Sequence, residues 1–221
     1  MSLIGQKIDN LKAELPNQVK LVAVSKTKPT QAIEEAYAAG QRIFGENKVQ
    51  ELCQKFELLP KDIEWHMIGH LQSNKVKYIA PFVSLIHGVD SFSLLKEINK
   101  QGKKNKRKIP VLLQFHIAQE ETKFGFSYQE IEELFISTTP SSFENIEFYG
   151  VMGMATFTNN ESLIRTEFKL LHSYFTNLKS TIFKDFENFK EISMGMSGDY
   201  KYAIEAGSTM IRIGSTIFGN R

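Results

Sequence analysis

The sequence predicts a single α/β domain folded as a (β/α)8 barrel of the TIM type, and three observations support this. Short apolar runs typical of buried strands alternate about eight times with segments of helical periodicity. The connections are short, and no linker or low-complexity tract interrupts them. A doubly wound open sheet is the alternative, but the Gly-x-Gly-x-x-Gly turn expected after one of its strands is absent. The 221 residues suit one such barrel, so we expect one domain over residues 1–221.

The expected strands are short runs enriched in apolar and β-branched residues, as in parallel sheets that are buried on both faces. In chain order they cover residues 20–25, 42–44, 64–68, 83–87, 109–117, 146–151, 191–194 and 210–214. The expected helices begin near residues 1, 30, 47, 73, 91, 127, 162 and 199. Thr30, Ser91 and Asp199 have the side chains of helix N-caps, and prolines or glycines follow several of the helices.

Composition and charge exclude several classes of function. No apolar run approaches the roughly 20 residues of a membrane span, and the N-terminus lacks the apolar segment of a signal peptide. Cys53 is the only cysteine, which excludes an intrachain disulfide and fits a cytoplasmic protein. The net charge of +2 includes a basic run over residues 103–108. This run lies between a helix and a strand, so we expect a solvated loop and no nucleic-acid partner.

Lys26 lies where the first strand ends. The apolar run Leu21–Val24 precedes it, and Pro29 prevents the chain from continuing as a central strand. In a (β/α)8 barrel this end of the strand faces the site of chemistry. A partly desolvated lysine amine can react with a carbonyl to form a Schiff base, whereas the structural alternative is a solvated lysine at a strand end.

Two C-terminal segments, residues 193–199 and 210–216, have the chemistry of an anion site. Each carries a strand into glycine and serine, where backbone N–H groups and hydroxyls are exposed. Barrels often bind phosphate with the loops after the seventh and eighth strands, which is where these segments fall. We therefore expect Ser197, Gly214 and Ser215 at a phosphate site.

Arg212 precedes Gly214 by two residues, so both point to the same side of the eighth strand. A buried arginine needs an acceptor, and a structural ion pair is the ordinary explanation. If a pyridine ring lay in the barrel mouth, Arg212 would instead donate to its nitrogen, with Lys26 facing an aldehyde. These features together describe a site for pyridoxal 5′-phosphate (PLP).

His66 and His70 are four residues apart, but a strand and loop need not bring them together. The glutamate of a His-Glu-x-x-His motif is also absent, so we expect no metal site. His66, within the strand, is expected to point into the barrel beside the cofactor. Met152 and Met154 are expected in the core.

Five segments of the chain resemble the pyridoxal phosphate homeostasis proteins, which are single-domain relatives of the N-terminal barrel of alanine racemase. The resemblance rests on Val22–Lys26, Phe44–Asn47, Trp65–Lys75, Ser193–Asp199 and Arg212–Gly219. It implies that Lys26 carries PLP as an aldimine and that Arg212 meets the pyridine nitrogen. It also implies that Ser197, Gly214 and Ser215 hold the phosphate and that Asn47 lies near the cofactor. The basic run and Phe157–Asn160 are less typical of the family.

The function implied by the resemblance is to hold PLP and release it to other proteins, such as apo PLP-dependent enzymes, without substantial amino-acid turnover. Racemisation needs an acid/base on each face of the cofactor, and racemases supply one from a further C-terminal domain. This chain ends at Arg221, so we expect that domain to be missing and no residue to be catalytic. An arginine at the pyridine nitrogen also weakens the ring as an electron sink. We expect a monomer or weak dimer.

Two alternatives remain open at this stage. One is a PLP-dependent amino-acid racemase or lyase. The other is a barrel that binds a different phosphorylated ligand and uses Lys26 as an aldolase-type Schiff base.

Overall fold

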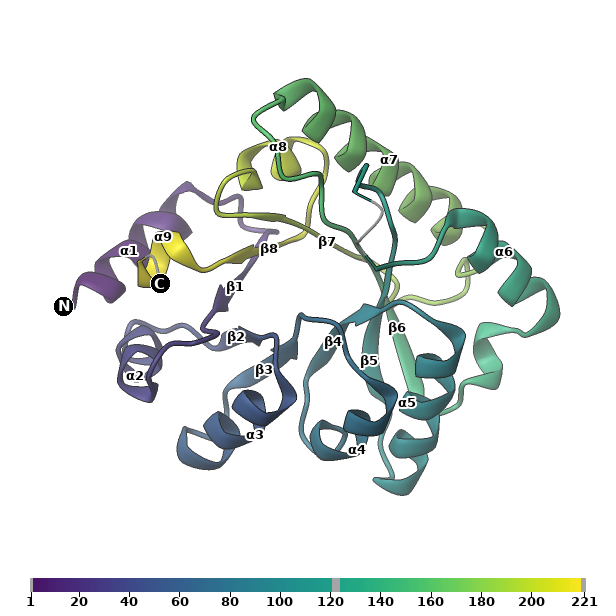
Figure 1. The fold of residues 1–221 in the computed structure, drawn as a ribbon, viewed down its shortest axis with the longest axis horizontal. Coiled ribbons are helices and arrows are strands. Elements are labelled where there is room, and N and C mark those ends of the chain that lie inside the picture. The colour runs from purple at the N-terminus through teal and green to yellow at the C-terminus, as the bar shows by residue number, and fades with distance from the viewer. Residues whose placement is uncertain (1, 121–123, 220–221) are drawn as a thin grey trace.

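The computed structural model describes residues 2–120 and 124–219, and within them eight parallel strands close into a barrel in sequence order (Figure 1). The strands are β1 (Lys20–Val24), β2 (Ile43–Glu46), β3 (Glu64–Met67), β4 (Leu85–Val89), β5 (Ile109–Gln114), β6 (Ile146–Met152), β7 (Glu191–Met196) and β8 (Met210–Ile213). Pairing of β1 with β8, with Val22 opposite Arg212, closes the barrel. The predicted fold class is confirmed. The ends of the predicted domain, Met1 and Arg221, lie outside the described residues.

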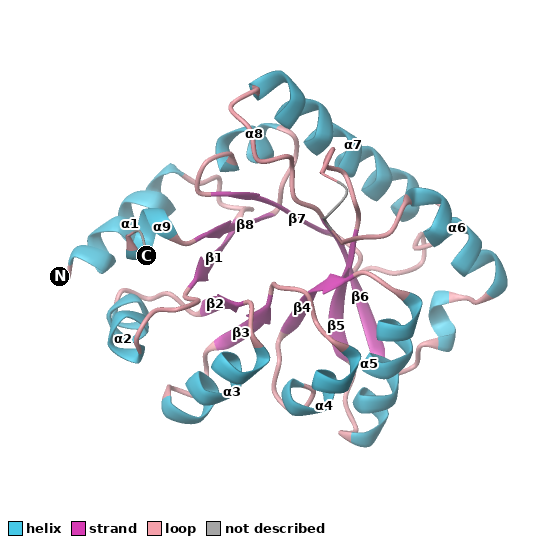
Figure 2. Ribbon diagram, in the orientation of Figure 1, coloured by secondary structure: helices cyan, strands magenta, loops and turns pink. Residues whose placement is uncertain are grey.

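Helices form an outer ring around the strands (Figure 2). They are α1 (Leu3–Glu14), α2 (Thr30–Ala38), α3 (Val49–Leu58), α4 (Val76–Ile79), α5 (Phe92–Lys104), α6 (Tyr128–Ser137), α7 (Glu161–Ser180), α8 (Tyr200–Glu205) and α9 (Ser215–Phe218), with 3-10 turns at Ser73–Lys75 and Pro140–Ser142. Helices α1 and α9 contact each other, so the first and last helices lie side by side (Figure 1). Among the described residues, no helix has both the length and the apolar character that crossing a bilayer would require.

Local capping interactions explain several helix starts and correct two predictions. Ser91 caps α5 as predicted, by accepting a hydrogen bond from the backbone N–H of Leu94. Thr30 is the first residue of α2 rather than its cap, and the cap position is Pro29, whose side chain makes no capping bond. Asp199 occupies the cap position of α8, but its carboxylate accepts from the N–H of Met196 instead. That bond tightens the turn after β7.

The basic run is only partly a loop. Lys103 and Lys104 form the last turn of α5, where positive charge complements the helix dipole. The predicted solvated loop is therefore wrong for these two residues. The strand predicted to reach Ile117 also ends earlier, at Gln114. Beyond it, Phe115 pairs in an isolated bridge with Phe126.

The barrel interior is layered. A large apolar core fills the space between strands and helices, and a smaller cluster inside the barrel consists of Val22, Leu85, Leu112, Met152 and Met210. Arg212 follows Met210 by two residues on β8, as His87 follows Leu85 on β4, so each pair shares a face of its strand. Buried polar side chains therefore lie next to this apolar cluster, toward the carboxyl ends of the strands.

Candidate functional site

A cavity of about 650 Å³ is formed by residues at or just beyond the carboxyl ends of the strands. This is the face on which barrel proteins bind and transform ligands. Every predicted site residue except His66 lines it: Lys26, Asn47, Ser197, Arg212, Gly214 and Ser215. Residues from β1, β7 and β8, far apart in sequence, thus meet at one cavity.

Lys26 belongs to a short loop that follows β1 and leads to α2. The next residue, Thr27, has a left-handed backbone conformation with φ of 64°. Lys28 donates hydrogen bonds to the carbonyls of Phe218 and Gly219, at 3.2 and 3.1 Å. The loop is therefore held against the C-terminal end of the described chain, close to the predicted phosphate site.

The loops after β7 and β8 meet at Ser197 and Gly214. The backbone N–H of Gly214 donates to the Ser197 hydroxyl at 3.3 Å, and Ser215 begins α9. The turn after β7 is possible because Gly195 has φ of 96°, which is unfavourable for residues with a side chain. Hydroxyl and backbone N–H groups thus gather at one end of the cavity, and they are suitable donors to a phosphate.

Arg212 is a buried residue in the lining of the cavity, and its two identified partners are neutral. It donates to the Ser193 hydroxyl at 2.6 Å and to the Gly153 carbonyl at 3.2 Å. Burial lowers the pKa of the guanidinium to about 10, while the charge of Asp199 acts in the opposite direction. Arg212 therefore remains a cation at neutral pH and can only donate hydrogen bonds.

Below Arg212, the polar contacts continue through two histidines. The Ser193 hydroxyl lies 2.9 Å from Nδ1 of His87, and Nε2 of His87 lies 3.0 Å from Nδ1 of His66. Burial lowers the pKa of His66 to about 3, with a smaller contribution from Lys20, and the pKa of His87 falls well below its usual value mainly through burial. Both rings are therefore neutral at physiological pH.

The direction of these hydrogen bonds follows from the chemistry of Arg212. The guanidinium of Arg212 can only donate, so the Ser193 oxygen accepts from it and we assign the Ser193 hydroxyl as the donor to Nδ1 of His87. The His87 proton then lies on Nε2, which donates to Nδ1 of His66. His66 points into the barrel, but it does not line the cavity. Its position is below Arg212, so its predicted role as a direct cofactor contact gains no support from the geometry.

His70 does line the cavity, and Asp90 orients it. Nδ1 of His70 lies 2.8 Å from Oδ2 of Asp90, and the imidazole stacks on Phe124 with ring centroids 4.1 Å apart. His66 and His70 thus have different partners. The His70 imidazole thus lies in the lining of the cavity, with the Asp90 carboxylate on its Nδ1 side.

Asn47 is held close to the loop after β3. A methyl group added at Gly69 would meet the backbone oxygen and Cα of Asn47 at 2.6 and 2.8 Å. Only glycine permits this approach, and it brings Asn47 and Gly69 together on the cavity wall.

Sequence reasoning missed the residues that support Lys26 and Arg212. Ser193 lies in the segment predicted to bind an anion, but its contact with Arg212 was not predicted. His87 was assigned to a strand without a role. Lys55 and Glu51 form an i,i+4 pair on α3, which by sequence alone is typical of a solvated helix face.

Comparison with known proteins identifies the family. Residues 2–221 match the family model for the N-terminal domain of alanine racemase. The pyridoxal phosphate homeostasis protein of Aquifex aeolicus is 39% identical over 207 residues, which cover 93% of this chain and 88% of that protein. The human protein of the same name is 38% identical over 230 residues, covering 99% and 82%. The chain belongs to the pyridoxal phosphate homeostasis protein family.

Solved structures agree with this membership. PipY of Synechococcus elongatus without PLP superposes with a TM-score of 0.92 at 32% identity, covering 98% of this chain and all of PipY. PipY with PLP bound gives a TM-score of 0.88. Alanine racemase of Bartonella henselae gives 0.73 at 17% identity, covering 99% of this chain and 58% of the racemase, which shows a shared barrel fold. The resemblance recognised in the sequence is thus confirmed for this homeostasis protein family.

Proposed function

We propose that the chain binds PLP in the barrel-mouth cavity, holds it as a Schiff base on Lys26, and releases it to other proteins. The observation that carries this proposal is that Lys26 and the donor Arg212 line the same cavity as Ser197, Gly214 and Ser215. An amine, a ring-nitrogen donor and a set of phosphate donors are the functional groups that PLP requires. The PLP-bound PipY structure supports the same ligand.

The capture step is reversible and needs no further reagent. The neutral Lys26 amine adds to the PLP aldehyde, a C=N bond forms, and one water molecule leaves. Addition of water, or exchange with an amine of another protein, regenerates the lysine and frees the cofactor. A holding function is therefore compatible with the chemistry of one lysine.

Arg212 favours a holding function over catalysis. A protonated pyridine nitrogen needs a hydrogen-bond acceptor beside it, and the Arg212 guanidinium is a cation that can only donate. Arg212 therefore disfavours the protonated form of the pyridine ring. An unprotonated ring withdraws electrons from a substrate carbon less strongly, which slows amino-acid chemistry. We infer that the chain turns over amino acids poorly, and the name shared by its relatives fits this inference.

Three further points belong to the proposal. The recipients are apo PLP-dependent enzymes, the protein acts in the cytoplasm, and it is a monomer or weak dimer.

A second candidate is an amino-acid racemase or lyase, and one observation favours it. His70 lines the cavity with its Nδ1 bonded to Asp90, an arrangement that can move a proton at Nε2. Sustained turnover of an amino acid that is lost in both Lys26→Ala and His70→Ala would establish this candidate in place of the first.

The proposed function is tested by measuring the transfer of PLP from this protein to an apo enzyme. The protein is loaded with PLP, freed of excess cofactor and mixed with an apo PLP-dependent enzyme, whose recovered activity is followed over time. The proposal expects activation by the loaded protein and none by PLP-treated Lys26→Ala after the same desalting. Equal activation by both would contradict it.

A further inference from the structure

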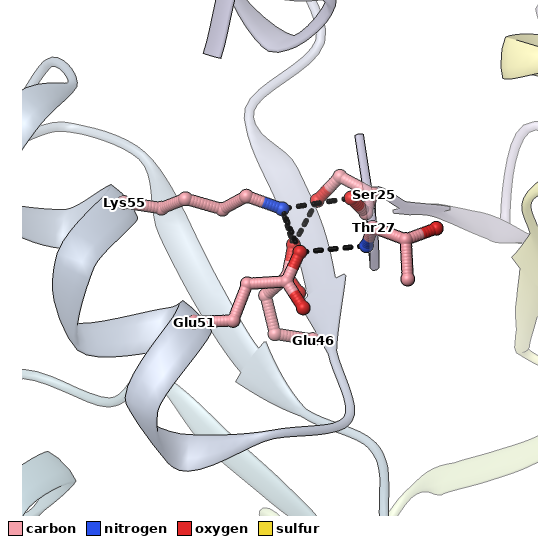
Figure 3. A network of polar contacts seen from close by, with 5 residues as sticks. All are labelled: Ser25, Thr27, Glu46, Glu51 and Lys55. Atoms are coloured by element: carbon pink, nitrogen blue, oxygen red, sulfur yellow. Dashed lines mark hydrogen bonds and ion pairs between the residues drawn. The ribbon is translucent and has the colours of Figure 1, made fainter. Parts of the chain in front are cut away.

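A polar cluster whose inner members, Ser25, Glu46 and Lys55, are buried lies directly behind the Lys26 loop (Figure 3). We call it the loop clamp, and it consists of Ser25, Thr27, Glu46, Glu51 and Lys55. Nζ of Lys55 donates to the Ser25 carbonyl at 2.8 Å, to Oε1 of Glu46 at 2.8 Å and to Oε1 of Glu51 at 2.7 Å. The Ser25 hydroxyl donates to Oε1 of Glu46 at 2.6 Å. The clamp therefore ties the loop to β2 and α3.

The clamp holds the peptide groups on both sides of Lys26. The Ser25 carbonyl belongs to the peptide that precedes Lys26, and Lys55 binds it. The Thr27 N–H belongs to the peptide that follows Lys26, and it donates to Oε1 of Glu51 at 2.6 Å. With both flanking peptides held, the Cα position of Lys26 and the direction of its Cα–Cβ bond are held as well.

Thr27 shows why such support is needed. Its φ of 64° lies in the left-handed region, which is unfavourable for a β-branched residue. Strained backbone of this kind persists where surrounding contacts determine it, and here the contact is the Glu51 carboxylate. The bond to Glu51 opposes relaxation of Thr27 to an extended conformation.

The loop that carries Lys26 also separates two cavities. Thr27 and Lys28 line the site cavity and also a second hollow of about 630 Å³, which Glu51 and Lys55 line from the other side. Space is therefore present into which the loop can shift if the clamp is broken. Such a shift would draw Lys26 away from the site.

Burying the charged groups of the clamp costs desolvation free energy, so stability alone does not explain them. Lys55 is 5% exposed and Glu46 is fully buried, and Oε2 of Glu46 has no hydrogen-bond partner among the described residues. Buried ion pairs often stabilise a fold no better than apolar residues of the same size. Their geometry here, aimed at the two peptides around one lysine, indicates a positional role.

We propose that Glu51 and Lys55 are positioning residues that present Lys26 to the aldehyde of PLP. This inference rests on the proposed function. It adds that covalent capture depends on two residues that lie behind the loop, outside the site cavity. Loss of the clamp weakens capture by Lys26 and leaves recognition of the phosphate and ring in place.

The test compares Glu51→Ala, Glu51→Gln and Glu57→Ala. Glutamine keeps a side-chain oxygen that can accept from Thr27 and Lys55, whereas alanine keeps none. Glu57 is an exposed carboxylate on the same helix and serves as the matched control. Lys55 itself is left unchanged, because its removal would leave Glu46 buried without a cation.

Two ligands separate positioning from general support of the cavity. PLP offers phosphate, ring and aldehyde, whereas pyridoxine 5′-phosphate offers the first two and cannot react with a lysine. We expect Glu51→Ala to lower the apparent affinity for PLP at least tenfold and to leave the affinity for pyridoxine 5′-phosphate within twofold of wild type. The loss of PLP affinity should be smaller in Glu51→Gln than in Glu51→Ala. Amide hydrogen exchange over residues 25–28 is expected to rise at least tenfold in Glu51→Ala.

Several results would overturn the inference. Capture by Glu51→Ala equal to that of Glu57→Ala would remove the positioning role. An equal loss of affinity for both ligands would mean that Glu51 supports the whole cavity. If the wild-type protein captured no PLP, the proposed function would fail separately. The exchange data would then decide whether the clamp orders the loop, and unchanged exchange in Glu51→Ala would refute it.

Discussion

Nε2 of His87 lies 3.0 Å from Nδ1 of His66, and this buried contact joins β4 to β3 beneath the cavity. Through Ser193 it continues to Arg212, the cation that faces the site. Since burial keeps both imidazoles neutral, the contacts fix ring tautomers without adding charge below Arg212. The position of Arg212, the proposed ring-nitrogen donor, thus depends on residues of three other strands, β3, β4 and β7.

Replacing Ser193 with alanine should disturb this arrangement at its centre. The change removes an acceptor of Arg212 and a partner of His87. We expect the free energy of unfolding to fall by about 1–3 kcal/mol, because buried polar groups lose a partner. We expect PLP affinity to fall roughly tenfold, which corresponds to about 1.4 kcal/mol. Chemical denaturation and PLP titration measure the two effects.

Ser208→Ala is the matched control for this prediction. Ser208 is also buried, and its hydroxyl contacts the carbonyls of Ile192, Met194 and Met210 rather than Arg212. It should lower stability and leave PLP affinity close to wild type. Equal affinity losses in the two variants would show that Ser193 acts only through the fold.

The buried histidines predict that acid destabilises the protein below pH 6.5. In the unfolded chain both titrate near pH 6.5, whereas in the fold the pKa of His66 is about 3 and that of His87 is also depressed. Below pH 6.5 the unfolded state therefore binds more protons, so stability is full above this pH and decreases as pH falls. At pH 5 the loss approaches roughly 2 kcal/mol for His66, and His87 adds a loss of the same sign.

Glu46 contributes with the opposite sign. Burial raises its pKa in the fold, so it loses stabilising effect as pH rises from the unfolded carboxylate pKa to the folded one. Urea denaturation from pH 5 to pH 8 measures the sum. We expect the histidines to dominate and unfolding midpoints to rise up to about pH 7. A midpoint that is constant between pH 5 and pH 7 would refute this assignment.

The proposed phosphate site predicts that one double variant will affect the binding of two ligands differently. In the double variant Ser197→Ala/Ser215→Ala the cavity loses two hydroxyls from its predicted phosphate end. Hydrogen bonds to a charged group contribute about 1.5–3 kcal/mol each, so PLP affinity should fall at least tenfold. Affinity for pyridoxal, which has no phosphate, should stay within about twofold. Parallel losses for both ligands would place the phosphate elsewhere.

Gly69→Ala should affect both folding and binding. Its new methyl group meets backbone atoms of Asn47 at 2.6 and 2.8 Å, and backbone cannot move aside as easily as a flexible side chain. We expect a loss of about 1–3 kcal/mol in the free energy of unfolding and weaker PLP binding. Gly198→Ala is the folding control, because its methyl group meets nothing within 4 Å. Wild-type stability in Gly69→Ala would contradict the close approach.

The sequence predicted those parts of the molecule that depend on periodicity and on strand ends. Lys26 and Arg212 reach one cavity because parallel strands in a barrel end at the same rim, and alternation along β8 turns Arg212 inward. The barrel itself follows from the same alternation of strands and helices.

The loop clamp and the histidine contacts depend on tertiary geometry that periodicity does not encode. Lys55 resembles an ordinary helix-surface lysine until α3 is placed against the end of β1, where it becomes buried. His66 was predicted to point into the barrel beside the cofactor, but its depth in the barrel depends on the strand register, which periodicity does not give. Pairing of His66 with Leu85 sets it beside β4, where His87 is its partner.

The central claim is tested most directly by locating the lysine that captures PLP. The protein is incubated with PLP, reduced with borohydride and digested, and the modified peptide is identified by mass spectrometry beside Lys26→Ala. We expect one pyridoxyl group on the peptide containing Lys26, and none on that segment in the variant. Equal modification of wild type and variant at another lysine, or no modification in either, would contradict the account.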